Sequence, residues 1–104
     1  MNKMINIILL FIFIVASSLQ AKDERVYCAM LFTSVSTMSF QNNDIETGKF
    51  YESKYKIILN KVKKNYSDNA LMKLMHDEMD NVLVLLKSED SDKIAQALTE
   101  CMKY

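Results

Sequence analysis

The sequence predicts an all-α fold, a small antiparallel four-helix bundle of up-down topology that follows a signal peptide and is closed by one disulfide. The chain contains no proline and a single glycine, which favours helices over a turn-rich sheet. Apolar residues recur at helical spacing in four segments, which we expect at residues 26–41, 49–66, 68–87 and 91–103. Amphipathic helices joined by short polar loops bury their apolar faces against one another in a bundle.

Residues 1–21 have the pattern of a secretory signal peptide. Lys3 supplies a positive charge, an unbroken apolar run follows, and small or tolerated residues lead to Ala21. The apolar run is shorter than the roughly 20 residues of a membrane span. We expect cleavage after Ala21, with Ser18 as the alternative site and an uncleaved membrane anchor as the alternative interpretation. The mature domain would then comprise residues 22–104, in the periplasm or secreted.

The segment 26–41 begins the mature domain and is the least certain to be helical. Five of its apolar residues share one face at helical spacing, namely Cys28, Leu31, Phe32, Val35 and Met38. The β-branched and hydroxyl residues at 33–37 are poor helix formers, so a strand is the alternative. We expect a helix here.

The longest polar interval, residues 41–48, predicts a loop that includes Gly48, the one residue without a Cβ. The helix expected at 49–66 then carries a regular apolar stripe of Tyr51, Tyr55, Ile58, Val62 and Tyr66. Lysines occupy its other faces, and Glu52 can pair with Lys56 one turn away.

The most apolar helix is expected at 68–87, and we expect the rest of the chain to be organised around its core, Ala70 to Leu86. Ser67 is placed to cap its N-terminus. The apolar stripe consists of Leu71, Met72, Met75, Met79, Val82, Leu83 and Leu86, with Leu74 and Leu85 beside it. Ser91 is the expected cap of the last helix, whose buried face would contain Ile94, Ala97, Leu98, Cys101 and Met102.

Two cysteines, Cys28 and Cys101, lie near opposite ends of the mature domain, each on the apolar stripe of its helix. In an exported chain this pattern predicts one structural disulfide, with two buried thiols as the alternative. No C-x-x-C pair is present, which argues against a redox-active site.

The sequence does not predict an enzyme. It contains one histidine, no glycine-rich loop and no G-x-S-x-G motif, so the common nucleophile arrangements lack parts. The clustered acids Asp77, Glu78 and Asp80 are expected on a solvated flank of their helix, and nothing in the sequence suggests the burial that acid–base catalysis by a carboxylate requires. We therefore expect no catalytic residue.

One helix face suggests copper as an alternative ligand, although we expect no cofactor. Met72, Met75, His76 and Met79 lie within about a third of the helix circumference, and thioether and imidazole groups suit Cu(I). Methionine is also an ordinary core residue, and packing is the simpler explanation of this face.

Charge is segregated along the chain. From Lys49 to Tyr66 there are six lysines and one acid, whereas residues 68–92 contain seven acids and two lysines. The simple explanation is attraction between neighbouring helices, with Lys54 and Lys61 meeting acids. The alternative is a basic face for an acidic protein surface. Its lysines would be those that lie away from the apolar stripe, namely Lys49, Lys56, Lys63 and Lys64.

These observations favour a protein that works by binding. Near-neutral overall charge argues against nucleic acid as the partner. We expect an exported immunity or inhibitor-type protein that binds another protein, which has an acidic surface if the lysines carry the contact. The alternatives are a periplasmic copper-binding protein and a membrane-associated factor of the cell envelope, the latter if the signal segment is retained. The chain shares only its size, export signal and helical pattern with small exported immunity proteins, stress chaperones and inhibitors.

Overall fold

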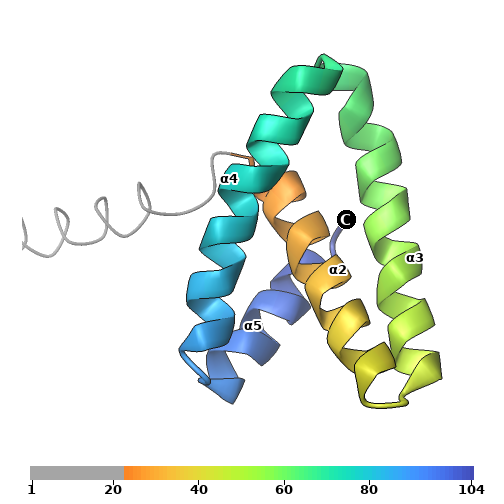
Figure 1. The fold of residues 1–104 in the computed structure, drawn as a ribbon, viewed down its shortest axis with the longest axis vertical. Coiled ribbons are helices and arrows are strands. Elements are labelled where there is room, and N and C mark those ends of the chain that lie inside the picture. The colour runs from red at the N-terminus through yellow and green to blue at the C-terminus, as the bar shows by residue number, and fades with distance from the viewer. Residues whose placement is uncertain (1–22) are drawn as a thin grey trace, which may run out of the picture.

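A computed structural model describes residues 23–104, which form helices joined by short turns, with no strand among them. The helices are α2 (Glu24–Gln41), α3 (Ile45–Val62), the 3₁₀ turn η1 (Lys63–Asn65), α4 (Asp68–Lys87) and α5 (Ser91–Cys101). Figure 1 shows their arrangement as a small helical bundle, which confirms the predicted all-α class. The predicted signal peptide and its cleavage sites lie outside the described residues. No helix in the described part of the chain is long and apolar enough to cross a membrane.

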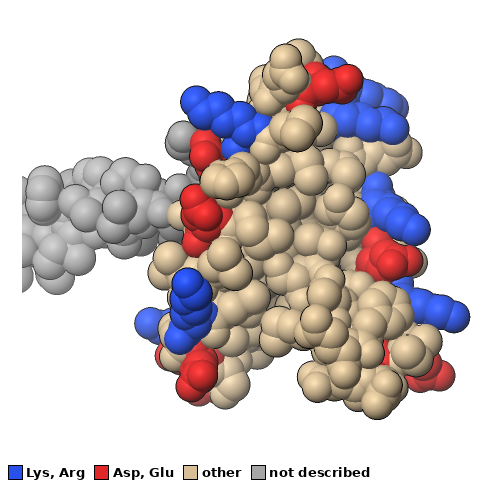
Figure 2. Space-filling view, in the orientation of Figure 1, with Lys and Arg blue, Asp and Glu red and all other residues tan. Residues whose placement is uncertain are grey.

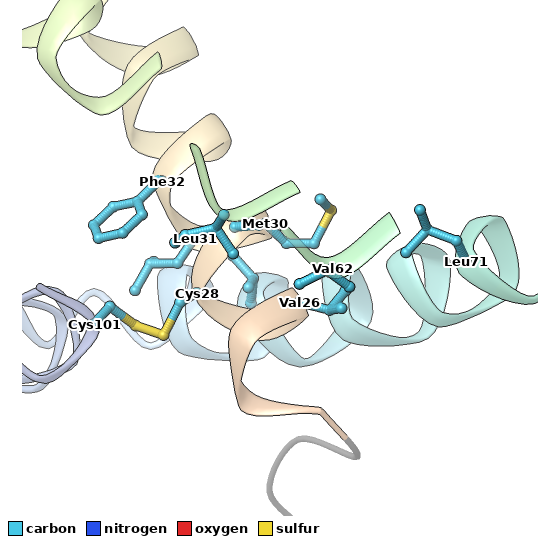
Figure 3. Packing of buried hydrophobic residues seen from close by; sticks show 11 residues of the cluster. Val26, Cys28, Met30, Leu31, Phe32, Val62, Leu71 and Cys101 are labelled. Atoms are coloured by element: carbon cyan, nitrogen blue, oxygen red, sulfur yellow. A yellow bond between two sulfur atoms is a disulfide. The ribbon is translucent and has the colours of Figure 1, made fainter. Parts of the chain in front are cut away.

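Helix α2 is the centre of the bundle, with α3, α4 and α5 packed around it (Figure 1). The prediction that the chain is organised around residues 70–86 is therefore wrong. Six of the seven residues at 26–32 are buried, which fits a helix that neighbours cover on several sides. Figure 3 shows the packing of this core. Its buried hydrophobic members are Val26, Cys28, Ala29, Met30, Leu31, Phe32, Ile58, Val62, Leu71, Val82 and Cys101.

The hydroxyl-rich part of α2 is helical, which settles the choice between helix and strand. The Ser34 hydroxyl donates to the Met30 carbonyl oxygen at 2.8 Å, and Thr37 donates in the same way to Thr33 at 2.9 Å. Ser36 is buried and donates across the interface to the Gly48 carbonyl oxygen on α3, at 2.7 Å. Two of these hydroxyls thus bond within the helix, whereas Ser36 ties α2 to α3.

The turn between α2 and α3 is shorter than predicted, because α3 begins at Ile45 rather than at residue 49. Asn43 takes a left-handed conformation with φ of 63°, and the Asp44 side chain caps the helix by accepting from the Thr47 amide. Gly48 lies inside α3 and not in the loop. A Cβ there would lie 2.6 Å from a ring carbon of Phe40, so glycine allows this close approach.

Helices α3 and α4 diverge from the turn that joins them and lie on different sides of α2 (Figure 1). At that turn η1 replaces the end of the predicted helix 49–66, and the Ser67 side chain caps α4 as predicted, accepting from the Ala70 amide. Tyr51 of α3 stacks on Phe32 of α2, with ring centroids 5.5 Å apart.

The side of α4 that faces the core differs from the predicted stripe. Leu71 and Val82 are buried, but Met72 is 69 % exposed and Leu83 40 % exposed. Glu78 is fully buried in the same face. The helix is thus turned about its axis relative to the prediction, and Leu74 and Leu85 pack at the edge of the core.

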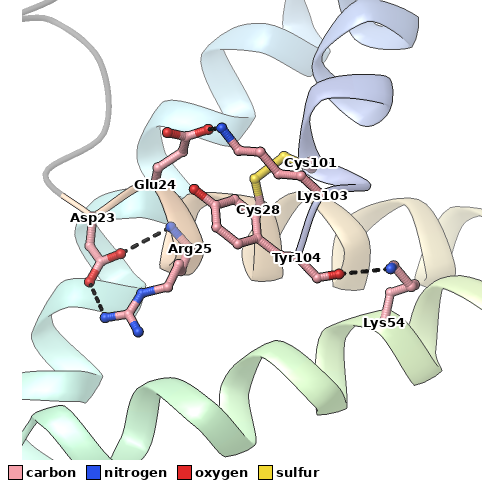
Figure 4. The surroundings of a disulfide bond; sticks show 8 residues. All are labelled: Asp23, Glu24, Arg25, Cys28, Lys54, Cys101, Lys103 and Tyr104. Atoms are coloured by element: carbon pink, nitrogen blue, oxygen red, sulfur yellow. Dashed lines mark hydrogen bonds and ion pairs between the residues drawn. A yellow bond between two sulfur atoms is a disulfide. The ribbon is translucent and has the colours of Figure 1, made fainter.

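The disulfide between Cys28 and Cys101 is confirmed, with a Cα–Cα distance of 5.4 Å, and it joins α2 to the end of α5 (Figure 4). The cap of α5 is Asp90 rather than Ser91. Met102, predicted in the buried face, is 36 % exposed. A disulfide of this kind indicates an oxidising, exported environment.

Candidate functional site

The surface that we call the lysine face of α3 consists of Lys49 and Lys56 of α3 and of Lys63 and Lys64 of the η1 turn that follows it, and all four residues are exposed. The opposite side of α3 packs on α2 through Tyr51, Tyr55, Ile58 and Val62, as the helical periodicity predicts. In Figure 2 several basic side chains lie along the edge of the molecule that α3 forms. The core thus orients this helix so that the lysine face points outward.

The ion pairs between residues 23–104 leave this face largely uncompensated. They join Lys56 to Glu52 at 3.4 Å, Arg25 to Asp23 and Lys103 to Glu24, and none of them joins α3 to α4. Among the described residues, therefore, no ion pair provides the attraction expected between the basic and acidic helices, and α3 and α4 diverge (Figure 1).

Two other lysines were expected to meet acids on a neighbouring helix. Lys54 instead donates to the main-chain oxygen of Tyr104 at 2.8 Å, which fastens the C-terminus to α3 (Figure 4). Lys61 is exposed. The C-terminal segment is also held to α2, because Lys103 pairs with Glu24 at 2.9 Å. This carboxylate raises the pKa of Lys103 above its usual value.

The four residues of the alternative copper site lie in different environments in the fold. Met72 and His76 are exposed, whereas Met75 and Met79 are half-buried and pack against the core. The Ser34 hydroxyl oxygen lies 3.5 Å from the Met79 sulfur. No cluster of three or more His, Cys or carboxylate side chains in the described part of the chain is placed to hold a metal ion.

A polar cluster around Glu78 was missed by the sequence reasoning, which placed this acid on a solvated flank. The Glu78 carboxylate accepts from the Asp23 main-chain amide at 2.8 Å and from the Asn81 side-chain amide at 2.7 Å. It also contributes, after burial, to raising the pKa of Tyr27 above its usual value. The spacing of the residues indicates that Glu78 faces the core, because it lies seven residues after Leu71 and four before Val82, on the same face of the helix.

Asp23 joins this cluster to the start of α2. Its side chain accepts from the Arg25 amide at 3.0 Å, which caps the helix, and from the Tyr66 hydroxyl at 2.6 Å. Burial alone would raise the pKa of Asp23, but the hydrogen bonds from Tyr66 and Arg25 outweigh it, so the pKa lies below its usual value. These interactions connect the start of α2 to α4 and to Tyr66, which directly follows the η1 turn.

An apolar groove of about 350 Å³ lies between α2 and α4. Its residues are Thr33, Ser34, Thr37 and Met38 of α2 and Met79, Leu83 and Leu86 of α4. The described surface thus carries a basic helix on one side and an apolar groove on another. No protein family matches the chain, and no curated protein or solved structure is detectably similar to it.

Proposed function

We propose that this protein is exported to the periplasm or secreted and acts by binding another protein, as an immunity or inhibitor-type partner, through the lysine face of α3. One observation carries the proposal. The fold directs these lysines into solvent and keeps α3 apart from the acidic helix α4 (Figure 1), so their charge remains available to a partner. The disulfide supports the exported location.

The partner that fits this face has an acidic surface. From residue 45 to 65 the chain contains six lysines and two acids, and Lys56 with Glu52 forms the one ion pair found within this described range. Clustered charge of one sign accelerates encounter with a surface of the opposite sign, and salt screens the effect. Binding here should therefore depend on charge mainly through the association rate.

The test begins with capture of a partner from the native envelope fraction and continues with the kinetics of the purified pair. We expect Lys56→Glu with Lys63→Glu to slow association by about tenfold at low salt and to weaken the salt dependence. The fold should persist, because exposed charges contribute little to stability.

A matched control makes the same change of charge on the acidic side of the molecule, with Lys87→Glu and Lys93→Glu, both at exposed positions. This control should associate at nearly the wild-type rate. If the two double variants bind the captured partner at the same rate, the lysine face does not carry the interaction.

A further inference from the structure

Part of the apolar surface of α4 is not covered by the other described helices. Because Glu78 and Val82 face the core, the neighbouring side of the helix remains uncovered, and Met72 and Leu83 are 69 % and 40 % exposed. Met38 of α2, 46 % exposed, continues this uncovered surface across the groove that α2 and α4 form. The described residues thus cover only part of the amphipathic face predicted for α4.

The groove is mainly apolar, and two of its three hydroxyl residues bond within their own helix. Ser34 and Thr37 donate to carbonyl oxygens of their own helix, at 2.8 Å and 2.9 Å, which occupies their hydrogen atoms. The Ser34 hydroxyl also contacts the Met79 sulfur. What faces an incoming group is therefore mainly methyl, thioether and leucine surface. Methionine adapts to the shape of its occupant, and a volume of about 350 Å³ admits apolar side chains.

An exposed apolar ridge, which we define as Phe50 and Ile57, lies on α3. Phe50 and Ile57 are 51 % and 49 % exposed, although both are large apolar residues. They are seven residues apart, so they lie on one side of the helix about 10.5 Å from each other along its axis. Lys54 and Lys61 each follow one of them by four residues and lie beside the same line.

We propose that the groove takes the Phe50–Ile57 ridge of a second copy of this chain. Charge complementarity favours this occupant. Residues 45–65, which carry the ridge, hold six lysines and two acids, whereas residues 80–92, which include Leu83 and Leu86 of the groove, hold four acids and one lysine. The chain as a whole has no net formal charge, so copies do not repel one another overall.

Ridge and groove are different surfaces of the molecule, so the contact between two copies is heterologous. Each copy offers a ridge to one neighbour and a groove to another. The contact is small, and it belongs to the class of weak, concentration-dependent interfaces. It does not depend on the protein partner proposed above.

Sedimentation equilibrium of the oxidised protein tests the contact, from about 10 µM to about 1 mM, where weak interfaces associate. The ridge variant is Phe50→Gln with Ile57→Gln, and the groove variant is Met38→Gln with Leu83→Gln. The control is Ile45→Gln with Val84→Gln, two exposed apolar positions, 49 % and 72 %, outside both ridge and groove.

We expect the average mass of wild type and of the control to rise with concentration, and that of the ridge and groove variants to remain monomeric. An equimolar mixture of these two variants should form a dimer, because one retains an intact groove and the other an intact ridge. High salt should weaken the wild-type association. A monomeric wild type, variants that associate like wild type, or a mixture that stays monomeric would each overturn the proposal.

Circular dichroism of every variant shows whether a loss of association is caused by unfolding. All four substituted ridge and groove positions are between 40 % and 51 % exposed, and glutamine is a good helix former, so the helical signal should match that of wild type. A folded variant that no longer associates has lost the contact and not the structure.

Discussion

Replacing Val82 with aspartate should leave the chain largely unfolded. Val82 is fully buried in the face of α4 that packs on α2, and its neighbourhood already contains the buried carboxylate of Glu78. A second charge there would have no compensating partner, and such a change costs about 3–5 kcal/mol or more. The core of a domain of this size supplies only about 3–5 kcal/mol. Far-UV circular dichroism at room temperature measures the outcome.

The control for this prediction is the adjacent residue, since the same substitution at Leu83 changes a position that is 40 % exposed. Leu83→Asp should remain folded and melt within several degrees of wild type, because most of the new charge stays hydrated. Similar melting temperatures for the two variants would show that the core-facing side of α4 has been assigned incorrectly.

Removing the disulfide is expected to have the next largest effect. The bond joins residues that are 73 positions apart, and the chain-entropy argument assigns about 4 kcal/mol to a loop of this length. Substituting alanine at both Cys28 and Cys101 should therefore lower the free energy of unfolding by about this amount, which is a large part of the stability of so small a domain. Urea unfolding followed by circular dichroism gives the value.

Reduced wild type provides the comparison, because it lacks the bond but keeps both side chains. Cys28 is fully buried, so alanine at this position also removes packing, and the variant should be somewhat less stable than reduced wild type. Reduced and oxidised wild type that unfold at the same urea concentration would contradict a stabilising role for the disulfide.

The positions of the helices could be predicted where capping residues and apolar runs define them. Ser67 and the apolar run after it define α4 at 68–87, and the cysteine spacing predicts the disulfide. The predicted start of α3 is wrong because the prediction places Gly48 in a loop, whereas Gly48 lies inside the helix. Asn43 and Asp44 carry the relevant signal, since asparagine tolerates the left-handed turn and aspartate is a strong N-cap.

The centre of the fold was misplaced for a different reason. A clear one-sided apolar stripe, such as that of α4, marks a helix that lies on the surface of a core. The apolar residues of α2 at 26–32 extend around the helix, and this is typical of an element covered on several sides. One-sided periodicity identified amphipathic helices correctly but did not identify the central one.

The candidate site also has features that the sequence predicts and features that it does not. Exposure of the lysine face follows from helical periodicity, because the apolar stripe of α3 fixes which residues face away. Burial of Glu78 could not follow from residue type, since it depends on the Asp23 main-chain amide, 55 positions away, which only the folded chain brings to Glu78. The groove likewise depends on the angle at which α2 and α4 meet (Figure 1).

Helix α2 is the core element, and α3 and α4 pack on it separately, which leaves the lysine face in solvent. Native-state amide hydrogen exchange, measured residue by residue, tests this most directly. We predict the slowest exchange in α2 at residues 28–32, at rates set by global unfolding, with faster exchange through α3 and α4. Slowest exchange within residues 70–86, with α2 less protected, would contradict the account.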